Sequence, residues 1–183
     1  MHKEALNKLK QLDFSKQAAF AYLICERLYP NYVDFSNKCG FGEPIILRKA
    51  IDYLYINLFE SNSDKINYFL KEVDKITPDT EDFETVMVSM ALDACTAIQD
   101  SLYFLTDNNF SRIINISSYA TDTVSVYIQE NEILDSQTDE NLPQKIDYHL
   151  LMQKEVALQI GTITYLEKIS SLLPIDIDTL RQL

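Results

Sequence analysis

Four ionisable side chains stand in or beside apolar stretches of this chain, and their types could support binding or acid–base chemistry. Glu26 and Arg27 directly follow an apolar stretch, and Asp93 interrupts the most apolar segment. His149 stands near the start of the last long apolar stretch. A carboxylate inside an apolar helix needs a partner, because an unpaired buried charge is very costly. We therefore expect an internal polar cluster, in which Arg27 or His149 pairs with one of the two carboxylates and Arg48 supplies further positive charge.

Such a cluster has two interpretations. It can tie helices together as a structural feature, with carboxylates and cations satisfying one another in the interior. It can also form a ligand-binding or catalytic site, because buried titratable groups cluster at active sites. The residue types alone leave both open, and they assign no catalytic residue.

The usual metal and catalytic motifs are absent from the sequence. It contains no phosphate-binding Walker A loop, no H-E-x-x-H, no EF-hand loop and no G-x-S-x-G. Cys25, Cys39 and Cys95 are odd in number, widely spaced, and match no closed zinc site even together with His149. The sequence therefore predicts no metal, no disulfide and no cofactor, with the cysteines reduced.

The elements that must position these residues are helical. Apolar residues recur at intervals of three and four, glycine occurs only three times, and five prolines fall between the periodic segments. We expect a single all-α domain over 1–183, an irregular helical bundle of six or seven helices around a central one at 84–105. The ends, 1–5 and 175–183, are expected to be loose termini. The expected helices cover about 3–12, 15–29, 44–59, 63–76, 84–105, 109–129 and 147–170.

Two boundaries follow from local signals. A residue before proline is disfavoured in the helical region, so the second helix is expected to end at Tyr29, with a short restart at Pro30. Gly40 is expected to cap a helix in the left-handed conformation. The acidic stretch 130–143 is expected to be the longest loop.

The charge is strongly negative and unevenly distributed. The 183 residues carry 16 basic and 28 acidic side chains, a net charge of −12. Between 76 and 144, Arg112 is the single base against 13 acids. Such a field repels phosphate backbones and anionic lipids, so we expect no nucleic-acid and no membrane partner. We instead expect a protein partner with a basic surface, or a homodimer formed through an apolar helical face away from the acidic residues.

The N-terminal residues lack the apolar run of a secretory signal, and no stretch approaches 18 uninterrupted apolar residues. The expected location is therefore cytoplasmic.

Several short motifs occur in a fixed order along the chain. They are Cys25-Glu26-Arg27, Pro30-Asn31-Tyr32 with Phe35, Phe41-Gly42, Asp93-Ala94-Cys95, and His149 with Met152-Gln153 and Glu155. In these motifs the chain resembles the YjaG-like family of bacterial all-helical proteins, which has no assigned function. In the family pattern a proline follows the histidine, where this chain has Leu150. The resemblance implies a compact helical bundle and a link to histidine-kinase signalling, and it identifies no catalytic residue.

Two functions are consistent with these observations. The first is a non-enzymatic module that binds another protein, in signalling. The alternative is a small-molecule binder or an enzyme that uses the polar cluster. A cavity lined by Glu26, Arg27, Asp93 and His149 would favour the alternative, and a solid core with an exposed apolar patch would favour the first.

Overall fold

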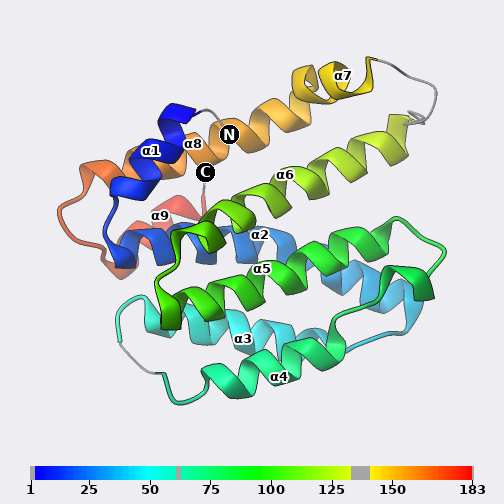
Figure 1. The fold of residues 1–183 in the computed structure, drawn as a ribbon, viewed down its shortest axis with the longest axis horizontal. Helices are drawn as coiled ribbons and strands as arrows, with labels where there is room; N and C mark the ends of the chain where they lie inside the picture. Colours follow the sequence, from blue (N-terminus) through cyan, green and yellow to red (C-terminus); the bar gives the residue numbers. More distant parts are fainter. Residues whose placement is uncertain (1–2, 61–62, 133–140, 183) are drawn as a thin grey trace.

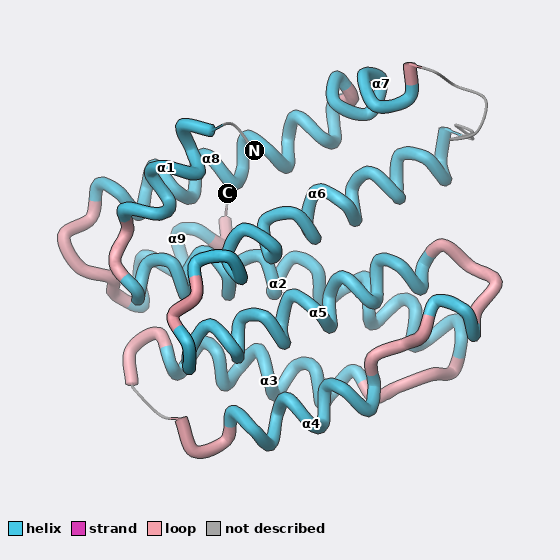
Figure 2. Tube along the Cα trace, viewed as in Figure 1, coloured by secondary structure: helices cyan, strands magenta, loops and turns pink. Residues whose placement is uncertain are grey.

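The structure is a computed structural model that describes residues 3–60, 63–132 and 141–182. Within these ranges it contains helices and no strand, so the fold is all-α as expected (Figure 2). The elements are α1 (Lys3–Gln11), α2 (Phe14–Cys39), α3 (Pro44–Asn57), α4 (Ile66–Ile76), the single 3-10 turn η1 (Thr80–Asp82), α5 (Met87–Asp107), α6 (Phe110–Glu132), α7 (Leu142–Tyr148), α8 (Leu150–Lys168) and α9 (Pro174–Leu180).

The expected number of six or seven helices is wrong, because the described ranges contain nine α-helices. The two additional ones are short. Pro143 and Pro174 each stand in the first turn of a seven-residue helix, where proline is well accommodated. Helix α9 occupies most of the segment 175–183 that was expected to be a loose terminus, and it buries Ile177 and Leu180 against the rest of the bundle.

Helices α2 and α5 form the centre of the bundle and pack most extensively against each other. Helices α3 and α4 cover one side of this pair, and α6 and α8 cover the other (Figure 1). Tyr22, Tyr32, Phe35 and Phe104 are among the largest fully buried side chains. The expected central helix at 84–105 is α5, and it is packed on both sides.

Helix α2 does not end at Tyr29, contrary to expectation. It continues through Pro30 to Cys39, although an internal proline removes one backbone hydrogen bond and costs about 3 kcal/mol. Leu28, Tyr32 and Phe35 are buried on either side of the proline, and this apolar burial offsets the cost. The helix ends as expected, at Gly40, which adopts a left-handed φ of 65° and donates its N–H to Ser36.

Helices α7 and α8 meet at a sharp turn around His149. The backbone of His149 is extended, and its Nδ1 accepts a hydrogen bond from the N–H of Leu151, which caps α8. A small second core of Ile128, Leu142, Ile146 and Met152 holds this corner against α6. Of the expected loop at 130–143, residues 133–140 lie outside the described part of the chain.

Candidate functional site

The four residues predicted to form one cluster are placed at four different positions. Glu26 and Arg27 are separated because of the geometry of the helix that carries both. Glu26 and Arg27 are consecutive on α2, so their side chains leave the helix about 100° apart and meet different neighbours. The expected pairing of Arg27 with Glu26 or Asp93 is wrong.

Glu26 faces α3 and the end of α9. Its carboxylate accepts hydrogen bonds from Arg48 at 2.7 and 3.0 Å, as the sequence allowed, and from Arg181 at 3.1 Å. Tyr22 also donates to it. Burial alone would raise the pKa of Glu26, but the hydrogen bonds from Arg48 and Tyr22 hold it below its usual value. Glu26, Arg48, Arg181 and Tyr22 thus join α2, α3 and the end of α9, and they form a structural ion-pair cluster.

Arg27 faces α8 and begins a polar network inside the bundle. Its Nη2 donates to Glu155 at 2.8 Å, and Glu155 also accepts from Gln159 at 2.8 Å. Gln159, almost fully buried, accepts from the Ser117 hydroxyl at 2.7 Å and donates to the Ser117 carbonyl at 3.2 Å. The network therefore joins α2, α8 and α6 through side chains that satisfy one another.

Asp93 has a hydroxyl partner and no ion-pair partner among the described residues. Thr123 on α6 donates to its Oδ2 at 2.8 Å. Burial raises the pKa of Asp93 to about 6, and the nearby carboxylate of Asp122 adds to the shift, while the bond from Thr123 opposes it. The folded protein therefore disfavours ionisation of Asp93.

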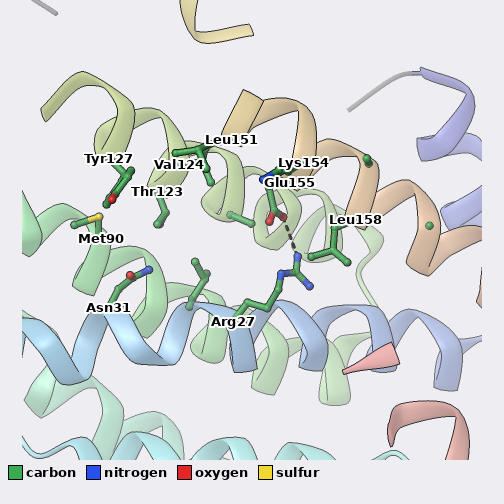
Figure 3. Close-up of a pocket in the computed structure, with 14 residues that line it drawn as sticks. Arg27, Asn31, Met90, Thr123, Val124, Tyr127, Leu151, Lys154, Glu155 and Leu158 are labelled. Carbon is green, nitrogen blue, oxygen red and sulfur yellow. Dashed lines mark hydrogen bonds and ion pairs between the residues drawn. The ribbon is translucent and has the colours of Figure 1, made fainter. Parts of the chain in front are cut away.

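A groove lies between α2, α5, α6 and α8, with a volume of about 840 Å³. Figure 3 shows Arg27 reaching from α2 to Glu155 on α8 at one end, and Met90, Asn31 and Tyr127 at the other. The lining is largely apolar. It consists of Leu28, Met90, Ala120, Val124, Leu151, Ala157, Leu158 and Gly161 together with the polar Arg27, Asn31, Thr123, Tyr127, Lys154 and Glu155.

Of the four predicted residues, Arg27 lines the groove directly. Asp93 does not line the groove, but it accepts a hydrogen bond from Thr123, which does. Sequence inspection missed Lys154, Gln159 and Tyr127. One signal was present: Glu155 and Gln159 are four residues apart, so they share a face of α8 with the apolar stripe.

The guanidinium of Arg27 has unused hydrogen-bonding capacity. Its Nε is buried and has no hydrogen-bond partner, and its Nη1 makes one long bond of 3.4 Å to the Leu23 carbonyl. An arginine has five N–H donors, and a buried donor left without a partner is destabilising. A buried donor without a partner is uncommon in native proteins and calls for an explanation, for example strain, a functional role or a bound water.

Gly161 lies in the interior of α8 and lines the groove. A Cβ added at Gly161 would meet no atom within 4 Å. Glycine inside a helix costs about 0.5–1 kcal/mol relative to alanine, and no contact of the folded chain requires it here. The glycine therefore keeps space in the groove rather than relieving a clash.

The cysteines are reduced and are placed apart from the groove. Cys25 is buried and in contact with the hydroxyl of Ser101, and burial raises its pKa to about 12. Cys95 is likewise buried, and Cys39 is half-buried. No group of three or more His, Cys, Asp or Glu side chains within residues 3–60, 63–132 and 141–182 could hold a metal ion. No helix in these ranges is both long enough and apolar enough to cross a membrane.

Comparison with known proteins agrees with this architecture. The family model described as "Protein of unknown function (DUF416)" matches residues 4–183, nearly the whole chain. The chain belongs to this family. A crystal structure of a DUF416 family protein from Shewanella baltica OS155 superposes with a TM-score of 0.87 at 30% identity, covering 97% of this chain and 91% of that one.

The sequence relatives confirm the resemblance to the YjaG-like family. The chain is 28% identical over 122 residues to "Uncharacterized protein YjaG" of Escherichia coli, a match that covers 65% of this chain and 62% of that protein. It is 27% identical over 138 residues to the YjaG protein of Salmonella typhimurium, covering 74% and 69%. A proline after the histidine, as in the family pattern, would occupy the first position of α8, where Leu150 stands.

Proposed function

We propose that this protein binds a small amphipathic molecule in the groove between α2, α5, α6 and α8. The observation that carries the proposal is an open, mostly apolar groove that contains an arginine with unused donors. Small-molecule sites are typically concave, of roughly 300–1,000 Å³, with an apolar lining and a few placed polar groups. The volume of about 840 Å³ lies within that range.

The groove also has the supported geometry that binding requires. Arg27 and Glu155 are held by their mutual ion pair and by Gln159 behind them, so the polar end is organised before any ligand arrives. The apolar end is built from side chains on four helices rather than on loops. Gly161 preserves space at the wall of the groove.

The test uses 8-anilinonaphthalene-1-sulfonate, an apolar anion whose fluorescence rises in apolar surroundings. Gly161→Leu places a large side chain at the groove wall, and Gly161→Ala is the matched control because it removes the glycine but leaves most of the space. We expect saturable dye binding by the native protein and the alanine variant, and clearly weaker binding by the leucine variant. Thermal unfolding establishes that both variants fold. Equal dye binding by all three folded proteins would contradict the proposal.

A second function, binding of another protein, is favoured by a surface outside the lining of the groove. At the corner between α7 and α8, Tyr148 is 78% exposed and Leu150 61%, and neither lines the groove. Adjacent exposed apolar side chains are typical of interaction sites. The surplus of acidic residues suits a basic partner, such as a signalling protein, whereas an apolar contact suits a homodimer.

The dependence on salt concentration distinguishes a basic protein partner from an apolar homodimer. Light scattering across a salt series, on the protein alone and with co-purified proteins, should show a basic partner released at high salt and an apolar dimer maintained. Tyr148→Ser should weaken either contact without affecting dye binding in the groove. A monomer at every salt concentration with no partner recovered would contradict this second function.

A further inference from the structure

We propose that the ligand of the groove is an apolar carboxylate, whose headgroup is bound by Lys154 and Arg27 and whose apolar body extends toward Met90 and Tyr127. This inference rests on the proposed function and adds the charge and the orientation of the ligand. It is supported by the charges of the lining, by their partners, and by the charges at the far end of the groove.

The lining of the groove is positive, although the chain as a whole carries −12. Its charged side chains are Arg27, Lys154 and Glu155, with two positive charges and one negative charge. Glu155 is already engaged by Arg27 and Gln159. The remaining positive charge is complementary to one anionic group on a ligand, and a low-dielectric groove strengthens that interaction relative to open water.

Lys154 is the positive charge without a counter-ion. It is exposed at the edge of the groove and makes no ion pair with any residue in the described ranges. Arg27 lies across the groove with a side chain 28% exposed. Its Nε is buried, so we assign the contact with the ligand to the N–H groups of Nη1 and Nη2. A carboxylate is the anionic group that suits this pair, because one of its oxygens can accept a charge-assisted hydrogen bond from the lysine and the other from the arginine.

The far end of the groove determines the orientation. Asn31, Met90 and Tyr127 also line a neighbouring cavity of about 370 Å³, so the two spaces are adjacent. That second cavity is bordered by Asp34 and Glu130 against one lysine, and its negative surplus repels an anion. The headgroup is therefore placed at the Arg27 end, with the apolar body along Leu28 and Val124.

The test compares three probes with the same ten-carbon chain: decanoate, decan-1-ol and decyltrimethylammonium, each below its micelle concentration. Isothermal titration calorimetry with the full chain should show decanoate binding roughly tenfold more tightly than the alcohol, the effect of about 1.4 kcal/mol from one charge-assisted contact. The cation should bind most weakly. Gly161→Leu should weaken decanoate and decanol alike.

Lys154→Gln should remove most of the preference for decanoate over decanol, and Lys154→Arg should retain it. The matched control is Lys168→Gln, which removes the same charge from the same helix at a position outside the groove. If decanoate and decanol bind equally and Gly161→Leu blocks both, the anion inference fails and the binding function stands. If none of the three probes binds, both fail. Tighter binding of the cation would also overturn the inference.

Discussion

Replacing Asp93 with asparagine should stabilise the protein at neutral pH, and by more at pH 7.5 than at pH 5.0. Asp93 is packed between α5 and α6, where it accepts a hydrogen bond from Thr123 and has no cation among its described partners. An asparagine side chain has nearly the same shape, and its oxygen can accept the same bond. The substitution therefore removes the charge and little else.

The magnitude follows from the pKa of Asp93, which burial raises from 3.8 to about 6. The unfolded chain loses this proton at lower pH than the folded chain, so ionisation favours unfolding. The stability cost grows as the pH rises from about 4 to about 6 and is constant above that. The full shift corresponds to about 3 kcal/mol, and partial solvent access reduces this to roughly 1–2 kcal/mol.

Urea unfolding of both proteins measures the effect at two pH values above the isoelectric point, which is near 4.5. Asp93→Asn should raise the unfolding free energy by about 1–2 kcal/mol at pH 7.5 and by roughly half of that at pH 5.0. Asp107→Asn is the control of opposite sign. Despite some desolvation, the N–H of Asn109 and the guanidinium of Arg112 lower the pKa of Asp107, so its neutralisation should destabilise. An Asp93→Asn variant that is less stable at pH 7.5, or changed equally at both pH values, would refute the reasoning.

Three further predictions concern glycine positions and the surface charge. Gly42→Ala should lower the unfolding free energy, measured with denaturant, by about 2–3 kcal/mol, because φ is +74° and the new Cβ would overlap the hydroxyl of Tyr32. Gly40→Ala should lower it by about 1 kcal/mol, because φ is +65° but the space around the new Cβ is open. Gly161→Ala should raise the unfolding free energy by about 0.5–1 kcal/mol, and a decrease would show that the position is strained. Fluorescence anisotropy with labelled duplex DNA should show no binding at about 0.15 M salt, because the net charge is −12.

The helices were predictable wherever one apolar face was long. The central helix, expected at 84–105, is observed as α5 at Met87–Asp107, because its stripe is buried along its whole length. The cap at Gly40 was predictable from the residue type alone. The passage of α2 through Pro30 was not, because burial of Tyr32 and Phe35 against distant elements outweighs a local preference.

The candidate site was predictable in part. The argument that ionisable groups in apolar helices need partners was correct for Glu26 and Arg27, and Arg48 was identified as a cation able to reach Glu26. The partner of Arg27, however, is Glu155, which lies 128 residues away. The pairing of distant side chains depends on the rotation of each helix about its axis and on the path of α8 across the bundle. The spacing of residues in the sequence determines neither. The groove likewise arises from the packing of four helices.

The two charges at the centre of α2 support the proposal that the groove is organised before a ligand arrives. Glu26 joins one face of α2 to α3 and to Arg181, and Arg27 joins another face, about 100° away, to α8 through Glu155. Because these ion pairs point in different directions, together they restrain the rotation of α2 and hence the position of the Arg27 guanidinium. A ligand that competed for the bond to Glu155 would leave a half-buried carboxylate unpaired, at a cost of about 3–5 kcal/mol. A headgroup that uses Lys154 and the remaining donors of Arg27 avoids that cost, which is why we propose this arrangement and not displacement of Glu155.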